Sequence, residues 1–138
     1  MGRKTEEVKV VIIAGSEKDK EHVEQIVDHL SYRGLNATTH YCSAHKEPRR
    51  LLDILEKCDM EDLKIIFVTV AGLSNALSGM VAANTTRPVL ACPPFASSVD
   101  YLIDIHSTLR MPSDSPVLTV IGPYNCAQAV LRLTNLAT

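Results

Sequence analysis

One turn of the sequence places three side chains of different chemistry close together. The stretch "HYCSAHKEP", residues 40 to 48, contains Ser43, His45 and Lys46. A hydroxyl and an ammonium can both bind an anion, and a histidine between them is a candidate general acid and base. Taken singly, the serine is a helix cap, the histidine a solvated bystander and the lysine a surface charge. Together they predict a turn that binds an anion and moves a proton beside it.

Two further turns carry polar residues of a similar kind. "AGSEKD" contains Ser16 and Asp19, and "AGLSN" contains Gly72 and Ser74. Serine hydroxyls and the free amides at helix starts can bind a phosphate, and Asp19 can accept hydrogen bonds from sugar hydroxyls. Capping of the following helix is the better interpretation of any one of these residues alone. Their clustering indicates a site for a small phosphorylated ligand, although neither G-x-G-x-x-G nor G-K-[ST] is present.

The remaining sequence predicts the elements that position these turns. Apolar runs of strand length alternate with segments of helical period, in the order β-α-β-α-β-α-β-α-β-α. Leu51, Leu52 and Leu55 are expected to face the core from the second helix. This order predicts an α/β fold, a three-layer αβα sandwich with a flavodoxin-like parallel sheet of order 2-1-3-4-5, whose ligands bind at the carboxyl ends of the strands. The expected strands are 8–14, 35–42, 64–72, 88–92 and 116–122, and the expected helices are 21–34, 49–58, 74–85, 97–110 and 124–137.

Composition narrows the class of protein. With 138 residues and 46% hydrophobic content, the chain suits a single domain over residues 1–138, in which residues 1–7 form a polar N-terminal extension. Fourteen basic and 16 acidic residues are interspersed and give a net charge of −2, so we expect no nucleic-acid partner. No apolar stretch is long enough to span a membrane or to form the hydrophobic segment of a signal peptide. This predicts no membrane partner and a cytoplasmic location.

The cysteines and histidines give no sign of a metal site. Cys42, Cys58, Cys92 and Cys126 form no C-x-x-C pair and are interpreted as small residues in or near the core. The histidines are scattered along the chain, and only His45 has suggestive neighbours. We therefore expect no bound metal.

Read in order, the motifs resemble those of a known family. "GSEKD", "SAHK", "VAGLSNALSG", "PVLACPP" and "STLRMPS" follow one another over essentially residues 8 to 138. They are similar to the motifs of the PurE-like aminoimidazole ribonucleotide (AIR) carboxylases and carboxyaminoimidazole ribonucleotide mutases of purine biosynthesis. "SAHK" within this order is the specific part of the resemblance.

The resemblance implies a role for each candidate residue. His45 would be the acid and base that acts on the ring carbon of AIR. The other implied substrate-binding residues would hold the ribose phosphate or the new carboxylate, or shape the pocket for carbon dioxide; they are Ser16, Asp19, Ser43, Ala44, Lys46, Gly72, Ser74 and Asn75. The resemblance also implies no cofactor, the small molecules AIR and carbon dioxide as partners, and a homo-oligomer, which is an octamer in the family.

The family has two branches, and this chain resembles one of them more closely. Mutases tend to have "SAHR" and a histidine in the third turn, whereas this chain has Lys46 and Asn75, which favours the carbon dioxide-using carboxylases. Two positions differ from the carboxylase pattern, since Lys18 replaces a serine and Leu73 replaces an arginine. The mutase and a non-catalytic nucleotide-binding protein therefore stay as alternatives.

Overall fold

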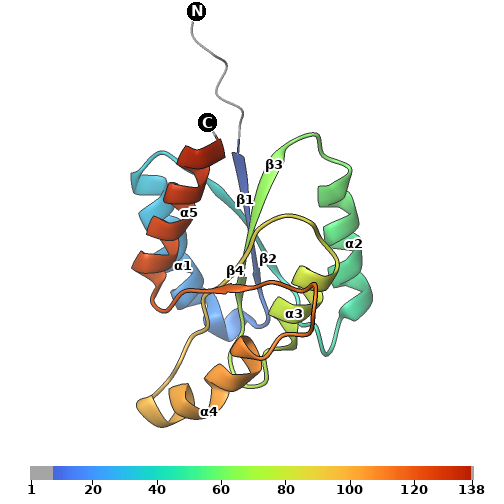
Figure 1. Cartoon of the computed structure of the whole chain (residues 1–138). Coiled ribbons are helices and arrows are strands. Elements are labelled where there is room, and N and C mark those ends of the chain that lie inside the picture. Colours follow the sequence, from blue (N-terminus) through green and yellow to red (C-terminus); the bar gives the residue numbers. More distant parts are fainter. Residues whose placement is uncertain (1–7, 138) are drawn as a thin grey trace, which may run out of the picture.

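The computed structural model describes residues 8–137, so the polar extension 1–7 and Thr138 lie outside the described part. Strands and helices alternate strictly along it (Figure 1). The strands are β1 Val8–Ala14, β2 Ala37–Tyr41, β3 Lys64–Val70, β4 Val89–Ala91 and β5 Leu118–Thr119. The helices are α1 Lys20–Tyr32, α2 Pro48–Asp59, α3 Ala76–Ala83, α4 Ser98–Leu109 and α5 Pro123–Ala137, and a short 3-10 turn, η1 Glu17–Asp19, precedes α1.

The strands form a single parallel sheet of order β2-β1-β3-β4-β5, which confirms the predicted topology. β1 lies between β2 and β3, and Ala14 at its end is in register with Tyr41 and with Val70. The first three strands therefore end at the same level. This alignment brings the turns that follow them to one edge of the sheet.

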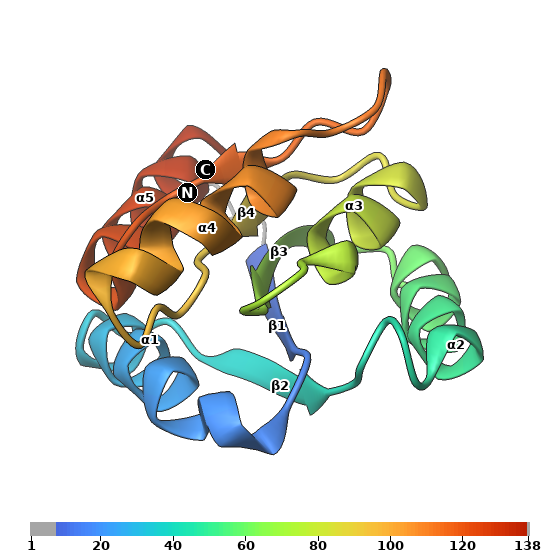
Figure 2. The same cartoon turned by 90° about the horizontal axis from the view of Figure 1, so that it is seen from below.

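Helices cover both faces of the sheet and give it two cores. Seen along the strands, α1 and α5 lie on one side and α2 and α3 on the other (Figure 2). Successive residues of β1 alternate between them, because Val10 and Ile12 pack toward α1 and α5 while Val11 and Ile13 pack toward α2 and α3. A strand buried on both faces must be apolar throughout, which explains the run "VKVVIIA". The four cysteines are free and buried, as predicted.

One detail of the predicted core is wrong. Leu52 was expected to face inward, but its exposed fraction is 38%, whereas Ile54 is 8% exposed. The buried face of α2 consists of Leu51, Ile54, Leu55 and Cys58. These residues follow the i, i+3, i+4, i+7 spacing of a single helical face, from which Leu52 is rotated by about 100°.

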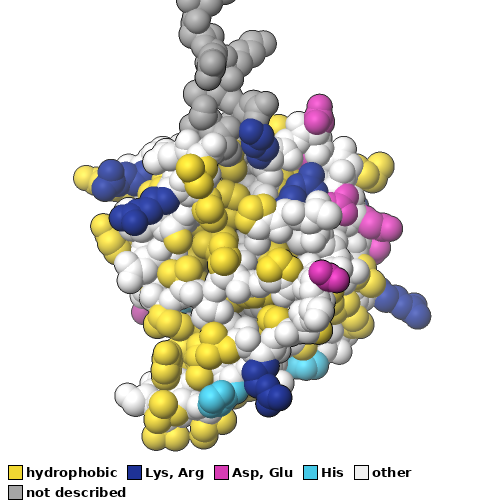
Figure 3. All heavy atoms as spheres, in the orientation of Figure 1, with side chains coloured by type: hydrophobic (Ala, Val, Ile, Leu, Met, Phe, Trp, Pro, Cys, Tyr) yellow, Lys and Arg dark blue, Asp and Glu magenta, His cyan; other side chains and the backbone are white. Residues whose placement is uncertain are grey.

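Helix α4 differs from the other helices because it lies beyond the carboxyl edge of the sheet (Figure 1). Only Ile105 and Thr108 of this helix are buried, whereas Val99, Leu102 and Ile103 are each more than 60% exposed. Hydrophobic side chains gather at the lower left of the space-filling view, over the region where α4 lies (Figure 3). Within residues 8–137, no helix has the length and hydropathy needed to cross a membrane.

Candidate functional site

A cavity of about 470 Å³ opens at the carboxyl edge of the sheet, among the turns that follow β1, β2 and β3. Main-chain hydrogen bonds hold the turns side by side: the Gly15 amide donates to the Val70 carbonyl at 2.9 Å, and the Cys42 amide donates to the Ala14 carbonyl at 2.8 Å. The cavity brings together most of the residues predicted from the sequence, namely Ser16, Asp19, Ser43, Ala44, His45, Lys46, Gly72 and Ser74.

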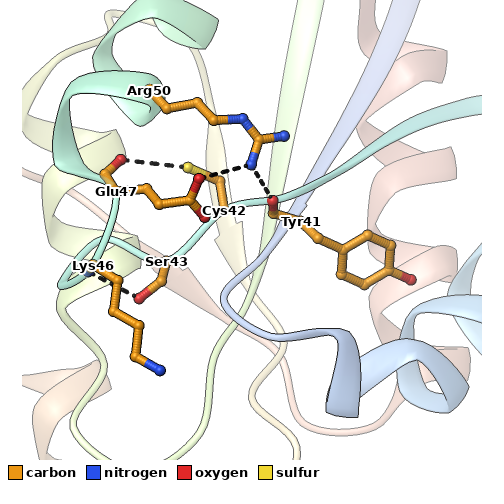
Figure 4. A network of polar contacts seen from close by, with 6 residues as sticks. All are labelled: Tyr41, Cys42, Ser43, Lys46, Glu47 and Arg50. Carbon is orange, nitrogen blue, oxygen red and sulfur yellow. Dashed lines mark hydrogen bonds and ion pairs between the residues drawn. The ribbon is translucent and has the colours of Figure 1, made fainter.

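The turn after β2 is compact and is closed by its own hydrogen bonds. The Ser43 hydroxyl oxygen accepts a hydrogen bond from the Lys46 amide at 3.2 Å, and the Ser43 carbonyl accepts one from the Glu47 amide at 2.8 Å. Pro48 then begins α2, a position at which its missing amide hydrogen costs nothing. His45 and Lys46 are exposed, and the Lys46 ammonium extends away from the neighbouring polar network (Figure 4). The His45 ring forms no hydrogen bond or ion pair with any described residue, which leaves it available to a ligand.

The Arg50 guanidinium, a second cation near this turn, is already bonded to neighbouring residues. Arg50 Nη1 donates to the Tyr41 carbonyl at 2.8 Å and lies 3.2 Å from Oε2 of Glu47 (Figure 4). The guanidinium thereby ties the start of α2 to the end of β2. Lys46 and Lys18, and not Arg50, are therefore the cations that line the cavity.

The turn after β1 supplies a hydroxyl and a carboxylate. The Ser16 hydroxyl oxygen accepts a hydrogen bond from the Lys18 amide at 3.2 Å, as a cap of η1. Ser16 and Ser43 accept these bonds through an oxygen lone pair, so each hydroxyl still has a hydrogen to donate to a ligand. Asp19 is half-buried, and this burial raises the pKa of its carboxyl, an effect that His22 partly opposes. Capping and ligand binding are thus compatible at these serines.

Asn75 does not line the cavity, unlike the other predicted residues. Its exposed fraction is 4%, and its side-chain oxygen accepts from the Ser78 amide at 3.1 Å as the cap of α3. Its amide nitrogen donates to the hydroxyl oxygens of Ser78 at 2.7 Å and Thr108 at 3.0 Å. Both polar ends of the side chain are therefore engaged inside the protein. Asn75 thereby ties the turn after β3 to α3 and α4.

Leu73 has an unusual backbone conformation at the rim of the same cavity. Its φ angle is 56°, in the left-handed region, and its exposed fraction is 79%. Residues other than glycine, asparagine and aspartate rarely adopt this conformation. Leu73 also lines a neighbouring cavity of about 520 Å³, which shares Lys18, Asp19 and Gly72 with the first.

The neighbouring cavity contains a residue that the sequence interpretation missed. His22 lines it, together with Phe95, Asp100 and Asp104. Burial lowers the pKa of the His22 ring, while the Cys92 carbonyl and Asp19 act in the opposite direction. The available signal was its position three residues after Asp19, in the first turn of the expected helix 21–34. Among residues 8–137, no group of histidine, cysteine and acidic side chains is arranged to hold a metal ion.

The comparisons with known proteins agree on one family. The family model described as AIR carboxylase matches residues 9–138. A phosphoribosylaminoimidazole carboxylase from Archaeoglobus fulgidus is 42% identical over 131 residues, which cover 95% of this chain and 71% of that protein. A human bifunctional phosphoribosylaminoimidazole carboxylase/phosphoribosylaminoimidazole succinocarboxamide synthetase is 34% identical over 94% of this chain and 30% of its own length. The crystal structure of Treponema denticola PurE superposes with a TM-score of 0.87 at 33% identity, covering 94% of this chain and 82% of that one.

Proposed function

The chain belongs to the AIR carboxylase family of purine biosynthesis, and from this membership we propose that it is a lyase that joins carbon dioxide to the ring carbon of AIR. The observation that carries the proposal is the position of His45. This imidazole stands at the rim of the 470 Å³ cavity, without a partner among the described residues and between hydroxyl and ammonium groups suited to an anion. His45 is also the only histidine among the described residues that line this cavity.

The proposed reaction needs one positioned base. The enamine-like ring carbon of AIR attacks carbon dioxide, which forms a carbon–carbon bond and turns one oxygen into carboxylate. The adduct still carries a hydrogen on the attacked carbon. His45 removes this proton, the electron pair returns to the ring, and aromaticity is restored. In the reverse direction the imidazolium returns the proton before carbon dioxide leaves.

The other lining residues would hold the two ends of the substrate. Ser16, Ser43 and Lys46 surround the cavity with donors for the phosphate or the new carboxylate. Asp19 would accept hydrogen bonds from the ribose hydroxyls. Gly72 would lie against the carbon dioxide end, where an added β-carbon would come within 3.4 Å of the Pro94 carbonyl. Carbon dioxide offers little binding energy, so much of the acceleration would come from holding it beside the ring carbon.

The arrangement of the third turn favours the carboxylase over the mutase. The mutase pattern places a histidine at the position of Asn75. Here the side chain at that position is a buried amide bonded to Ser78 and Thr108, so this turn brings no second acid or base to the cavity. A carboxylation in which His45 is the only acid and base is consistent with the residues of this turn.

Turnover of AIR by the purified protein tests the proposal. One reaction receives AIR with freshly supplied carbon dioxide, and a second receives the carboxyamino ribonucleotide as the only source of the carboxyl group. Turnover with carbon dioxide is the expected result, whereas turnover only with the carboxyamino compound would make the protein a mutase. Nucleotide binding without turnover in either reaction would make it a non-catalytic binder.

We also propose that the protein forms a homo-oligomer through α4. The exposed Val99, Leu102 and Ile103 lie on this helix, and Asp104 of the same helix lines the cavity beside the site. A second copy packed on α4 would bury these apolar side chains and cover part of the open cavity. The mass of the purified protein in solution, measured by light scattering, tests this assembly.

A further inference from the structure

His22 connects the start of α1 to the carboxyl end of β4. Its Nε2 atom lies 2.9 Å from the carbonyl oxygen of Cys92, the residue that directly follows β4. A carbonyl oxygen can only accept, so Nε2 carries the hydrogen and Nδ1 is unprotonated in the neutral ring. Burial lowers the pKa of His22, which favours this neutral ring. The contact therefore joins two elements that are 70 residues apart in the chain.

Asp19 depends on this connection for its position. It is the residue just before α1, yet its carboxylate makes no capping bond to the helix. The carboxylate also forms no hydrogen bond with any other described residue. Its place therefore follows from where the start of α1 lies, and the Asp19 side chain lines both cavities.

We propose that His22 is a positioning residue for Asp19. By holding the first turn of α1 against the end of β4, it sets the Asp19 carboxylate where the ribose hydroxyls of the substrate would bind. The inference rests on the proposed function in this respect, since it assigns Asp19 to the sugar. His22 does not itself contact the reacting atoms.

A purely structural role for His22 predicts a different result. Cys92 is 0% exposed, so its carbonyl would be left without a hydrogen-bond partner if His22 were removed. A buried carbonyl without a partner destabilises the folded protein. A purely structural contact would change the unfolding free energy and leave the site of the folded protein intact. The positioning role predicts that the site changes as well.

Affinity for AIR, measured by calorimetry well below the melting temperature, separates the two roles. His22→Leu should weaken AIR binding about tenfold, a coupling within the range seen for residues of one network. His22→Gln, which keeps an N–H group near the position of Nε2, should restore it. In an Asp19→Asn background, His22→Leu should cause no further loss. In turnover, KM should rise while kcat changes little.

The matched control is His29→Leu, on the same helix. His29 packs its ring against Tyr124 at a centroid distance of 4.8 Å, away from both cavities. This variant should lose stability without losing AIR affinity. If His22→Leu lowers stability but leaves AIR affinity at the wild-type value, the positioning role is overturned.

A ligand-free measurement keeps this inference distinct from the proposed function. At pH 7 the carbon-13 shift of the Asp19 carboxyl should move in His22→Leu and stay near the wild-type value in His22→Gln and His29→Leu. If the shift moves but the wild-type protein binds no AIR, the link between His22 and Asp19 stands and the proposed function fails. If the wild-type protein binds AIR but the shift stays fixed in His22→Leu, the inference fails alone.

Discussion

The amide nitrogen of Leu73 donates a hydrogen bond to Oδ2 of Asp104, 3.3 Å away on α4. The Ser107 hydroxyl lies 3.2 Å from the Leu73 carbonyl and 2.9 Å from the Asp104 carbonyl and shares its one hydrogen between them, so α4 reaches both polar backbone groups of this exposed residue. A left-handed conformation costs an L residue about 1–2 kcal/mol. The contacts with α4 offset that cost, and they hold the turn after β3 at the rim of the candidate site.

Leu73→Gly should therefore leave the protein as stable or make it more stable, by up to about 1 kcal/mol. Relief of the left-handed strain exceeds the entropy that a glycine loses on folding, about 0.5–1 kcal/mol. Leu73→Ala is the matched control, because alanine removes the same exposed side chain but keeps the β-carbon. Urea unfolding of both variants measures the difference. A glycine variant less stable than the alanine variant would show that the φ angle of 56° carries no strain.

His45→Asn should reduce turnover of AIR by about 10²- to 10⁴-fold, the usual contribution of a positioned acid and base. Binding of AIR should persist, because the donors of Ser43 and Lys46 are unchanged. Steady-state kinetics together with calorimetric binding measure the two effects, and His29→Asn serves as the control for loss of an imidazole elsewhere. Normal turnover in the His45 variant would refute the assignment of this residue as the base.

Lys46→Gln should weaken AIR binding by about 10- to 100-fold, as expected for loss of one charged hydrogen bond. The remaining affinity should depend less on salt, because one charge of the site is gone. Lys20→Gln is a suitable control, since Lys20 is an exposed cation on α1 that pairs with Glu24 at 3.8 Å. Equal losses in both variants would indicate a general effect of net charge and not a contact at Lys46.

Much of the fold could be predicted from the sequence, because its signals are local. The continuous apolar run of β1 and the helical spacing of Val23, Ile26 and Leu30 each report a burial pattern within one element. The strict alternation of strands and helices then allowed only a few strand orders for a parallel sheet, and the observed order 2-1-3-4-5 was among them. The turns of the candidate site followed, since they come directly after aligned strands.

The parts that could not be predicted depend on contacts between distant residues. The amide of Asn75 donates to Thr108, 33 positions further along the chain, and no local pattern shows that pairing. The same holds for His22 of α1, whose partner Cys92 lies 70 residues away, directly after β4. The family resemblance implied that Asn75 would be near the site, but its side chain is held inside the protein by its bonds to Ser78 of α3 and Thr108 of α4.

Asp19→Asn should stabilise the protein at pH 7 while weakening AIR binding. Burial raises the pKa of Asp19 above its usual 3.8, so the unfolded chain ionises first as the pH increases. The protonated carboxyl therefore favours the folded wild-type protein at a pH below the pKa of Asp19 in the unfolded chain. This stabilisation is lost as the pH rises through the higher pKa of Asp19 in the folded protein. Unfolding in urea at pH 3 and pH 7 measures it. Asp28→Asn, at an exposed position of α1, is the control for removal of one negative charge.

Ile103→Lys should shift the solution mass of the protein toward the monomer. Ile103 is 65% exposed on α4, and an ammonium at the centre of a packed apolar contact would be buried without a partner. The control is Met60→Lys, because Met60 is even more exposed, at 86%, but lies at the end of α2. Light scattering at equal protein concentrations compares the variants. A mass that is unchanged by Ile103→Lys, or lowered equally by Met60→Lys, would exclude α4 as the assembly surface.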